Sequence, residues 1–342
     1  MENRQIIFTS PGKAELVTNE IGRPGRGQAL IKTAFSTISS GTERANLVGD
    51  TNISPARGSG SGPAIFPRSL GYSSSGVVIE AGEGVKSVKP GDRVACSWGK
   101  HSMYQLLSEE NIHPLKPENS MRDAALSMIA TFPMAAIRKC GLEIGESAIV
   151  MGLGVLGLLA VQELRAAGGC PVIAADPTPE KRKKALSLGA DAAVDPFSPD
   201  FEEKVRALAP GGVNTAIEVT GSGKALDQVL DCMARFGRVG LLGCTRNSDF
   251  TIDYYRKVHG PGISLIGAHT NARPSFESSR GLWTTRDDIR AVLRLAAGGR
   301  LRLEGMVEET RSPLEAPEVY ARLAAERSFP VVQFDWDQLE NA

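Results

Sequence analysis

The sequence predicts an α/β protein in which a β-rich N-terminal region precedes a doubly wound parallel sheet. Short β-prone runs, broken by glycine and proline, fill roughly the first 120 residues. From there on, apolar strand-like runs alternate with helix-like segments, which is the pattern of a parallel sheet. A chain of 342 residues is long enough for two domains with sizeable cores.

Composition narrows the class of partner. Lys and Arg together number 39, as do Asp and Glu, so the net charge is zero and no basic balance points to nucleic acid or to a membrane surface. The five cysteines lack CxxC spacing, which favours a reducing compartment. No signal-peptide pattern opens the chain, and its longest apolar region, residues 148–161, is too short to span a membrane. We therefore expect a cytoplasmic protein that binds a small molecule.

The N-terminal region contains several short β-prone runs separated by turn residues. A segment rich in glycine and serine, residues 58–67, is expected to be either a flexible loop or backbone close to the active site. The expected strands are residues 5–8, 14–17, 28–36, 75–81, 92–96, 100–107 and 112–114.

The second region begins with a helical stretch, residues 121–141, that Pro133 interrupts. Expected strands and helices then alternate, at 148–151, 156–167, 172–175, 179–188, 192–194, 201–208, 215–219, 223–234, 238–242 and 263–267. After residue 268 the pattern changes to two amphipathic helices and a closing strand, at 286–297, 314–326 and 331–334. We place the domain boundaries accordingly at residues 1–120, 121–268 and 269–342.

One motif gives this second region a function. Gly152, Gly154 and Gly157 follow the first strand at GxGxxG spacing and open a helix. Such glycines permit a tight turn, let a pyrophosphate approach the backbone and let the helix lie close to the strand, while the helix N-terminus attracts the diphosphate. Asp176 closes the next strand, near the spacing of roughly 20 residues expected for a carboxylate that binds the ribose hydroxyls. The pattern therefore predicts dinucleotide binding.

Further motifs link the chain to a known family. Residues 89–94 (KPGDRV), 78–85 (VIEAGEGV) and 99–104 (GKHSMY), together with the glycine loop, resemble segments of the medium-chain dehydrogenase/reductase family. The resemblance covers nearly the whole chain, and the nearest branch is the one that resembles sorbitol dehydrogenase. It implies a GroES-like catalytic domain, a Rossmann domain and a C-terminal return to the catalytic domain. It also implies an oxidoreductase that acts on polyols or sugars.

The resemblance also implies a cofactor site for NAD. Asp176 and Lys181 match an acid and a lysine found in family members that use NAD. Arg182 is the residue that argues for NADP instead, since a nearby arginine can bind the 2′-phosphate of that cofactor. The implied cofactor-binding set is Gly152, Gly154, Val155, Leu156, Gly157, Asp176, Lys181, Thr220, Gly243 and His269.

The sequence departs from the family where zinc would bind. Ser39 and Ser40 stand where zinc-dependent members have a cysteine, and Tyr72 and Ser73 replace their histidine and glutamate. The third ligand position falls near Thr131. Because zinc requires several cysteine, histidine or carboxylate ligands at fixed spacing, we expect a zinc-independent member with no metal site.

Without zinc, protein groups must move the hydroxyl proton. The candidate catalytic residues are Tyr72, Thr42, His101, Glu43 and Ser40. We expect Tyr72, Thr42 and His101 to form a relay in which the imidazole passes the proton outward. Each residue also has a structural interpretation: Tyr72 fills the metal cavity, Thr42 caps a turn, Glu43 sits at a helix N-terminus, and His101 faces solvent.

Three functions follow from these residues. The first is an NAD-dependent dehydrogenase that interconverts a secondary alcohol (a polyol, a sugar or a related hydroxy compound) and its ketone. The alternatives are a zinc-free reductase of activated C=C bonds, similar to quinone reductases, and a non-catalytic NAD(H)-binding protein. We also expect a homodimer that pairs through the last strand, residues 263–267, since an apolar edge strand needs covering.

Overall fold

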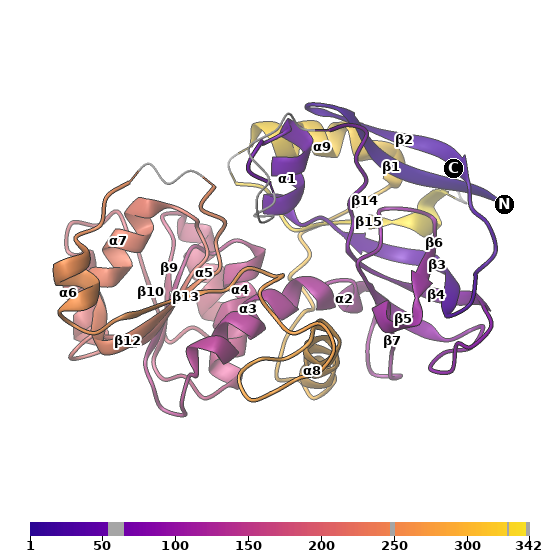
Figure 1. The fold of residues 1–342 in the computed structure, drawn as a ribbon. Helices are drawn as coiled ribbons and strands as arrows, with labels where there is room; N and C mark the ends of the chain where they lie inside the picture. The colour runs from indigo at the N-terminus through magenta and orange to yellow at the C-terminus, as the bar shows by residue number, and fades with distance from the viewer. Residues whose placement is uncertain (54–64, 247–249, 327, 340–342) are drawn as a thin grey trace. The chain divides into compact units, whose positions relative to one another are not determined.

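The computed structural model describes residues 1–53, 65–246, 250–326 and 328–339. The chain divides into two compact units, which Figure 1 traces by colour along the sequence: Met1–Ile129 with Leu303–Ala342, and Ala130–Arg302. This division groups residues 269–302 with the second unit, whereas the sequence assigned them to the C-terminal return. Most of the predicted loop at residues 58–67 lies outside the described residues.

The first unit is built mainly on antiparallel strands; only β14 and β15, among the described strand pairs of this unit, run parallel. A two-stranded sheet pairs β1 with β2, and a seven-stranded sheet runs β14-β15-β3-β4-β5-β7, with β6 added beside β3. The central strand β3 is almost wholly buried, and its Ala29 and Ile31 form a core with Val78 and Val94. The strands are β1 Glu2–Ser10, β2 Lys13–Glu20, β3 Gln28–Thr37, β4 Ser73–Ala81, β5 Arg93–Ser97, β6 Tyr104–Ser108, β7 Ile112–Pro114, β14 Glu309–Arg311 and β15 Val332–Asp335.

Short helices complete this unit. Helix α1 was anticipated from the sequence only through the interpretation of Glu43 as a helix N-terminal residue; it follows β3, has Glu43 in its first turn and ends at Gly49 with a left-handed φ of 74°. Its Gly41, Thr42 and Asn46 are weak helix formers, and the burial of Leu47 in a core shared with α9 compensates for them. The helices are α1 Ser40–Val48, α2 Met121–Ala124 and α9 Ala316–Ala325, with 3₁₀ turns at Glu109–Asn111, Pro313–Glu315 and Trp336–Leu339.

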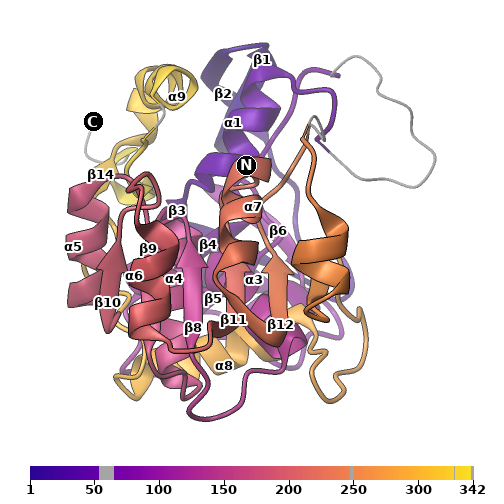
Figure 2. The ribbon, with the colours of Figure 1, turned by 90° about the vertical axis from the view of Figure 1, so that its left-hand side faces the viewer.

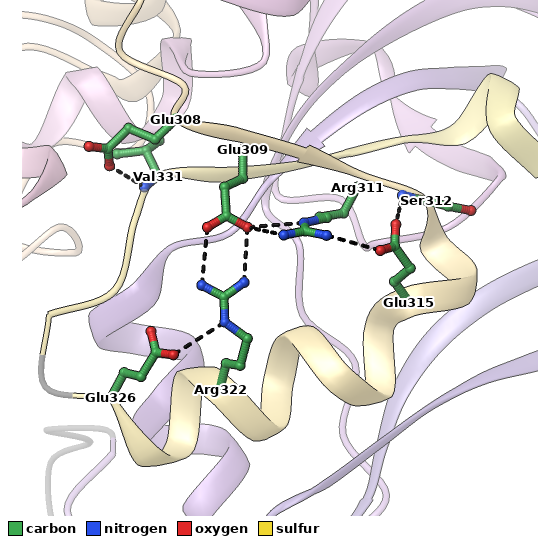
Figure 3. A network of polar contacts seen from close by, with 8 residues as sticks. All are labelled: Glu308, Glu309, Arg311, Ser312, Glu315, Arg322, Glu326 and Val331. Atoms are coloured by element: carbon green, nitrogen blue, oxygen red, sulfur yellow. Dashed lines mark hydrogen bonds and ion pairs between the residues drawn. The ribbon is translucent and has the colours of Figure 1, made fainter.

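An ion-pair network joins β14 to α9 (Figure 3). The two Nη atoms of Arg322, on α9, donate to the carboxylate of Glu309, on β14, at 2.9 and 3.0 Å. Arg311 binds the same carboxylate and also Glu315. Hydrogen bonds from the two guanidinium groups, Arg322 foremost, lower the pKa of Glu309 to about 2. The network thus ties the C-terminal segment together at its surface.

The second unit contains a six-stranded parallel sheet in the order β10-β9-β8-β11-β12-β13. This is the doubly wound order, in which the chain starts at a central strand, moves to one edge and then returns to build the other half. Figure 2 shows its strands with helices around them. The strands are β8 Ala148–Met151, β9 Val172–Ala175, β10 Ala192–Val194, β11 Val213–Glu218, β12 Met233–Leu241 and β13 Ser264–Gly267.

Helices alternate with these strands as the sequence predicts. The largest difference in a strand boundary is at β12, which begins at Met233, paired with Val213, rather than at residue 238, and α7 ends correspondingly earlier. A π-helical turn, Tyr255–His259, was not expected. In the described residues no helix is long and apolar enough to cross a membrane. The helices are α3 Ser127–Cys140, α4 Val155–Ala166, α5 Pro179–Ser187, α6 Phe201–Leu208, α7 Gly223–Asp231 and α8 Thr285–Ala297.

Candidate functional site

The glycine turn joins β8 to α4, and each glycine has a distinct structural reason. Gly152 has a φ of 95°, and a Cβ there would lie 2.8 Å from Cγ2 of Thr220. A Cβ on Gly157 would lie 1.9 Å from the Gly152 carbonyl oxygen, so only glycine lets the helix lie so close to the strand. A Cβ on Gly154 would meet nothing within 4 Å. The Gly154 backbone is therefore open to a ligand at the helix N-terminus.

Asp176 follows β9 and lies beside this turn. Its Oδ2 accepts a hydrogen bond from the Leu153 backbone N–H at 2.8 Å, and its Oδ1 accepts one from the Thr178 N–H at 2.9 Å. Arg182 donates from Nη1 to the Asp176 carbonyl at 2.6 Å and pairs with Asp195 at 3.2 Å. The Arg182 guanidinium is thus committed to protein partners, while the Asp176 carboxylate is fixed next to the open glycine turn.

The other predicted cofactor residues of this unit lie on α4 and α5. Val155 and Leu156 form the first turn of α4 and are half-buried, beside Gly154. Lys181 lies on α5, the helix that follows Asp176, and is also half-buried. These positions keep side chains of both helices near the carboxyl ends of β8 and β9, where ligands of doubly wound sheets bind.

A buried carboxyl that the sequence did not reveal organises the next strand end. Glu218, the last residue of β11, accepts hydrogen bonds from the Thr220 and Gly221 backbone N–H groups at 2.7 and 3.0 Å, and from the Thr220 hydroxyl. Burial raises the pKa of Glu218. Gly243, after β12, leaves no room for a side chain, since its Cβ would lie 2.2 Å from the Gly221 nitrogen. The only signal in the sequence was a glutamate near the end of a buried strand.

His269, the last of the predicted cofactor-binding residues in the chain, follows β13. Its Nδ1 accepts a hydrogen bond from the Asn271 backbone N–H at 3.2 Å. Burial lowers the pKa of His269, as do the positive charges of Arg246 and Lys139. Because parallel strands end at one edge of the sheet, the turns after β8, β9, β11, β12 and β13 all line the same edge. The unit thus gathers the predicted cofactor residues there.

In the first unit, three hydroxyl groups come together. Ser39 lies between β3 and α1, Thr42 lies in the first turn of α1, and Tyr72 lies just before β4. The Tyr72 hydroxyl donates to Oγ of Ser39 and lies 3.4 Å from Oγ1 of Thr42. Ser40 begins α1 and is half-buried. Three of the four hydroxyl residues singled out from the sequence therefore form one hydroxyl cluster, which we define as Ser39, Thr42 and Tyr72.

Glu43 and His101 lie in a separate, fully buried network behind that cluster. Glu43 accepts hydrogen bonds from the Ser39 backbone N–H at 2.8 Å, from the Tyr320 hydroxyl at 2.6 Å and from His101 Nε2 at 3.1 Å. His101 Nδ1 lies 2.7 Å from Oγ of Ser36. Burial and the Glu43 carboxylate raise the pKa of Tyr320 well above its usual value, so the phenol remains a donor. Ser36 and Tyr320 had no signal in the sequence.

The structure thus differs from the relay expected from the sequence. His101 is 1% exposed, so it does not face solvent and cannot pass a proton directly outward. Among the described residues, both imidazole nitrogens are occupied by Ser36 and Glu43, and neither contacts Tyr72 or Thr42. The link between the two groups is Ser39, whose backbone N–H binds Glu43 and whose hydroxyl binds Tyr72. Ser39 is therefore the residue through which the Glu43–His101 network is joined to the hydroxyl cluster.

The donor set at the expected zinc positions does not fit zinc. Tyr72 and Ser39 hydrogen-bond each other, and Oγ of Ser73 donates to the Ala125 carbonyl at 2.7 Å. Thr131 is fully buried. In the part of the chain that the structure describes, no three His, Cys, Asp or Glu side chains form a group that could hold a metal ion. Neutral hydroxyls already engaged with protein partners are poor replacements for the thiolate, imidazole and carboxylate ligands of zinc.

Two family models match the chain and span most of it together. The model described as "Alcohol dehydrogenase GroES-like domain" matches residues 25–117, and the model described as "Zinc-binding dehydrogenase" matches residues 155–285. These matches place the chain in the medium-chain dehydrogenase/reductase family of zinc-binding dehydrogenases. They confirm the predicted fold class, a GroES-like domain joined to a Rossmann domain with a doubly wound parallel sheet.

The chain is similar to several curated dehydrogenases. It is 28% identical to L-threonine 3-dehydrogenase of Pyrococcus horikoshii, over 88% of this chain and 89% of that protein. It is 23% identical to D-guloside 3-dehydrogenase of Escherichia coli K12, over 93% of this chain and 95% of that protein. The relatives thus differ in substrate while sharing the dehydrogenase name.

Solved structures share the fold. A protein from Sinorhizobium meliloti 1021 bound to NADP superposes with a TM-score of 0.81 at 23% identity and covers 98% of this chain and 100% of its own. An alcohol dehydrogenase from Escherichia coli CFT073 complexed with NADH has a TM-score of 0.80 at 17% identity, with 98% and 99% coverage. At these identities the likeness is evidence of the fold alone.

Proposed function

We propose that this chain is an oxidoreductase that uses a nicotinamide cofactor to interconvert a CH–OH group and a carbonyl. The observation that carries the proposal is the Asp176 carboxylate, held by two backbone N–H groups beside the open glycine turn. This is the chemistry expected of a site that binds a dinucleotide through its ribose and diphosphate. The names of the relatives, among them threonine and guloside dehydrogenases, support the same reaction type.

The residues present fit a nicotinamide dinucleotide. Gly154 and the first turn of α4 would receive the diphosphate, Asp176 the adenosine ribose, and the turns after β11 and β12 the nicotinamide half. The bound cofactor supplies the acceptor or donor of hydride. We propose NAD as the preferred cofactor, because Asp176 repels a 2′-phosphate and Arg182 is occupied by the Asp176 carbonyl and Asp195.

We propose that the hydroxyl cluster handles the proton without zinc. Thr42 and Ser40 would orient the substrate hydroxyl. In reduction the Tyr72 O–H would give its proton to the forming alkoxide, and the phenolate left behind would regain a proton from solvent; in oxidation Tyr72, having released its proton to solvent, would take the substrate hydroxyl proton as a phenolate. Ser39 supports the phenol by accepting its hydrogen bond, and Glu43 fixes the Ser39 backbone. Glu43 and His101 are therefore proposed as positioning residues. The hydroxyl groups suit a substrate that itself carries hydroxyls, such as a polyol, a sugar or a related compound.

The cofactor assignment is tested by isothermal titration with NADH and NADPH. The wild type is expected to bind NADH more tightly, and Asp176→Ser should narrow the preference by roughly tenfold, since it removes the charge that discriminates the two. Glu203→Gln, at an exposed glutamate of α6, is the control: it removes one carboxylate while Asp176 and both partners of Arg182 stay. A lower Kd for NADPH than for NADH in the wild type would overturn the assignment.

The reaction is tested by screening secondary alcohols, polyols and sugars for NADH formation, beside activated alkenes for NADH consumption. Activity on a hydroxy compound that persists in a metal chelator, with no stoichiometric zinc in the purified protein, is the expected result. One zinc per chain by plasma mass spectrometry would contradict the zinc-free proposal. Turnover of alkenes alone would favour a C=C reductase, and NADH binding without any turnover a non-catalytic protein.

We propose a homodimer formed through β13, whose outer edge has no strand beside it in the described residues. Light scattering that gives a monomer mass at micromolar concentration would refute it. The cytoplasmic location stays a prediction from the sequence.

A further inference from the structure

A pocket of about 260 Å³ lies within the first unit, lined by residues of β1, β2 and β6 and by the turn that follows β5. Figure 1 labels these strands. Most of the side chains that line the pocket are polar. No residue of the hydroxyl cluster lines it, and no residue proposed to bind the cofactor does. The pocket is therefore separate from the site proposed for the reaction.

The buried part of the lining is a set of polar side chains that already bind protein partners. Nδ2 of Asn19 donates to Oε1 of Gln5 at 3.1 Å, and Nε2 of Gln5 donates to Oγ of Ser69 at 2.7 Å. Nδ2 of Asn3 donates to Oγ of Ser102 at 3.0 Å. These hydrogen bonds hold the inner wall in place before a ligand enters, so binding needs little ordering of these side chains.

Trp98, the residue that follows β5, is the unusual member of the lining. Its side chain is 44% exposed, and its φ of 58° lies in the left-handed region, which bulky residues rarely adopt. Its backbone N–H donates to the Tyr72 carbonyl at 3.0 Å, which helps to hold this conformation. Strained backbone of this kind is found most often at ligand sites and active sites. Here it places a large flat ring at the mouth of a polar pocket.

The groups of the lining that have no protein partner decide which ligand fits. Among the described residues, no hydrogen bond or ion pair engages the indole N–H of Trp98, the ammonium of Lys100 or the carboxylate of Glu20. Together they offer donors and an acceptor, and the two charges cancel. A hydroxyl group both donates and accepts, so a neutral ligand with several hydroxyls satisfies all three. A charged ligand would be attracted by one of the two ions and repelled by the other.

We propose that this pocket binds a neutral sugar ring, such as a pyranose. The apolar C–H face of the ring would lie on the indole of Trp98, and its hydroxyls would bind Lys100 and Glu20. A cavity of about 150 Å³ holds benzene, so this larger pocket has room for one six-membered ring with its hydroxyl groups. It is a second binding site in the first unit, and no bond is made or broken there.

The experiment is saturation-transfer NMR of the full chain with methyl β-D-glucopyranoside, without cofactor. The expected result is saturable binding, with most of the transferred magnetisation on the ring protons of one face. Trp98→Ala should weaken binding by roughly tenfold, because it removes the flat apolar surface. Phe236→Ala is the matched control, since Phe236 is an exposed aromatic residue with a φ of 61° in the second unit; it should bind as the wild type does.

Two further variants separate this pocket from the hydroxyl cluster. Leu106→Trp, at a half-buried residue of β6 that lines the pocket, should fill the space and block the sugar while Trp98 stays. Tyr72→Phe should leave binding unchanged, because Tyr72 does not line the pocket. Loss of the sugar in Tyr72→Phe together with full binding in Leu106→Trp would place it at the hydroxyl cluster. That result would overturn this proposal and leave the proposed reaction intact.

The remaining outcomes are equally decisive. The proposal is overturned if the wild type binds no sugar, or if either Trp98→Ala or Leu106→Trp binds as the wild type does. Tighter binding of glucosamine or glucuronate than of the neutral glucoside would overturn the ligand class, since the paired charges of Lys100 and Glu20 favour a neutral ring.

Discussion

Two buried glutamates, one in each unit, have opposite surroundings. Glu43 lies on α1 in the first unit and accepts hydrogen bonds from Ser39, His101 and Tyr320. Glu163 lies on α4 in the second unit and has no hydrogen-bond partner in the described part of the chain. Both are at most 4% exposed. Two glutamates that are buried to a similar extent therefore differ in their partners: Glu43 has three hydrogen-bond donors, and Glu163 has none in the described residues.

The difference indicates what each carboxyl does. Donors from three separate segments converge on Glu43, so this carboxyl holds the core of its unit together and fixes Ser39, next to Tyr72. Glu163 lowers the stability of its own unit unless it stays protonated or gains a partner. A buried carboxyl with every partner present is part of a structural network, and one with none costs stability in its ionised form.

The largest effect is expected at Glu43. Glu43→Ala leaves the Ser39 N–H, the Tyr320 hydroxyl and His101 without their acceptor, so the free energy of unfolding should fall by about 3–5 kcal/mol. Urea unfolding followed by circular dichroism measures this loss. Glu43→Gln keeps one acceptor oxygen and should cost less. A loss below about 1 kcal/mol for the alanine variant would mean that the network does not hold the unit together.

The next largest effect is expected at Tyr72, the residue of the hydroxyl cluster that we propose for proton transfer. Tyr72→Phe removes the hydroxyl that binds Ser39 and should lower kcat by roughly 10²-fold, or about 2.7 kcal/mol, with the Kd for NADH unchanged. Stopped-flow or steady-state rates on the best substrate of the screen give the ratio. Tyr104→Phe, on β6, serves as the matched control. Nearly full kcat in Tyr72→Phe would mean that the phenol only fills space.

The third prediction concerns Glu163 and the pH dependence of the free energy of unfolding. Its pKa is raised above the ordinary 4.5, so above that pH the unfolded chain releases a proton that the folded chain keeps. Stability therefore falls as pH rises, by up to about 1.4 kcal/mol per pH unit, until the folded-state pKa is passed. Glu163→Gln should flatten this slope in chemical unfolding between pH 5 and 8. Identical slopes for the two proteins would show that the folded state does not retain that proton.

The smallest effect is expected at Glu309, a carboxyl that has hydrogen-bond partners, as Glu43 does, but lies near the surface. Arg322 and Arg311 lower the pKa of Glu309 to about 2, so its contribution is present above pH 4.5 and disappears as pH falls toward 2. Because the groups are partly exposed, Glu309→Gln should cost no more than about 1 kcal/mol at neutral pH, and less in high salt. Thermal unfolding at pH 7 and pH 3 would measure it. A larger difference between the two proteins at pH 3 than at pH 7 would contradict this sign.

Local patterns in the sequence determined much of this protein. The alternation of strand and helix predicted the six strands of the parallel sheet, and the glycine spacing with Asp176 predicted the turn at its edge. Such features depend on residues close together in the chain, where periodicity and backbone preference act directly. Thr42 and Tyr72 were also proposed as candidate site residues from the sequence. That proposal rested on their positions in family motifs and not on periodicity or backbone preference.

Only the tertiary structure decided which buried groups have partners. Glu43 accepts a hydrogen bond from Tyr320, 277 residues away, and that contact is the reason why we propose a positioning role for a carboxylate predicted to be catalytic. In the sequence, Glu163 cannot be distinguished from the other polar residues of its helix, such as the exposed Arg165. In the structure it is buried, and side chains of α3 and α8 lie beside it. Helix α1 likewise forms from weak helix formers because Leu47 finds a core to enter. Hydrogen-bond partners and burial come from distant segments, and no local pattern encodes them.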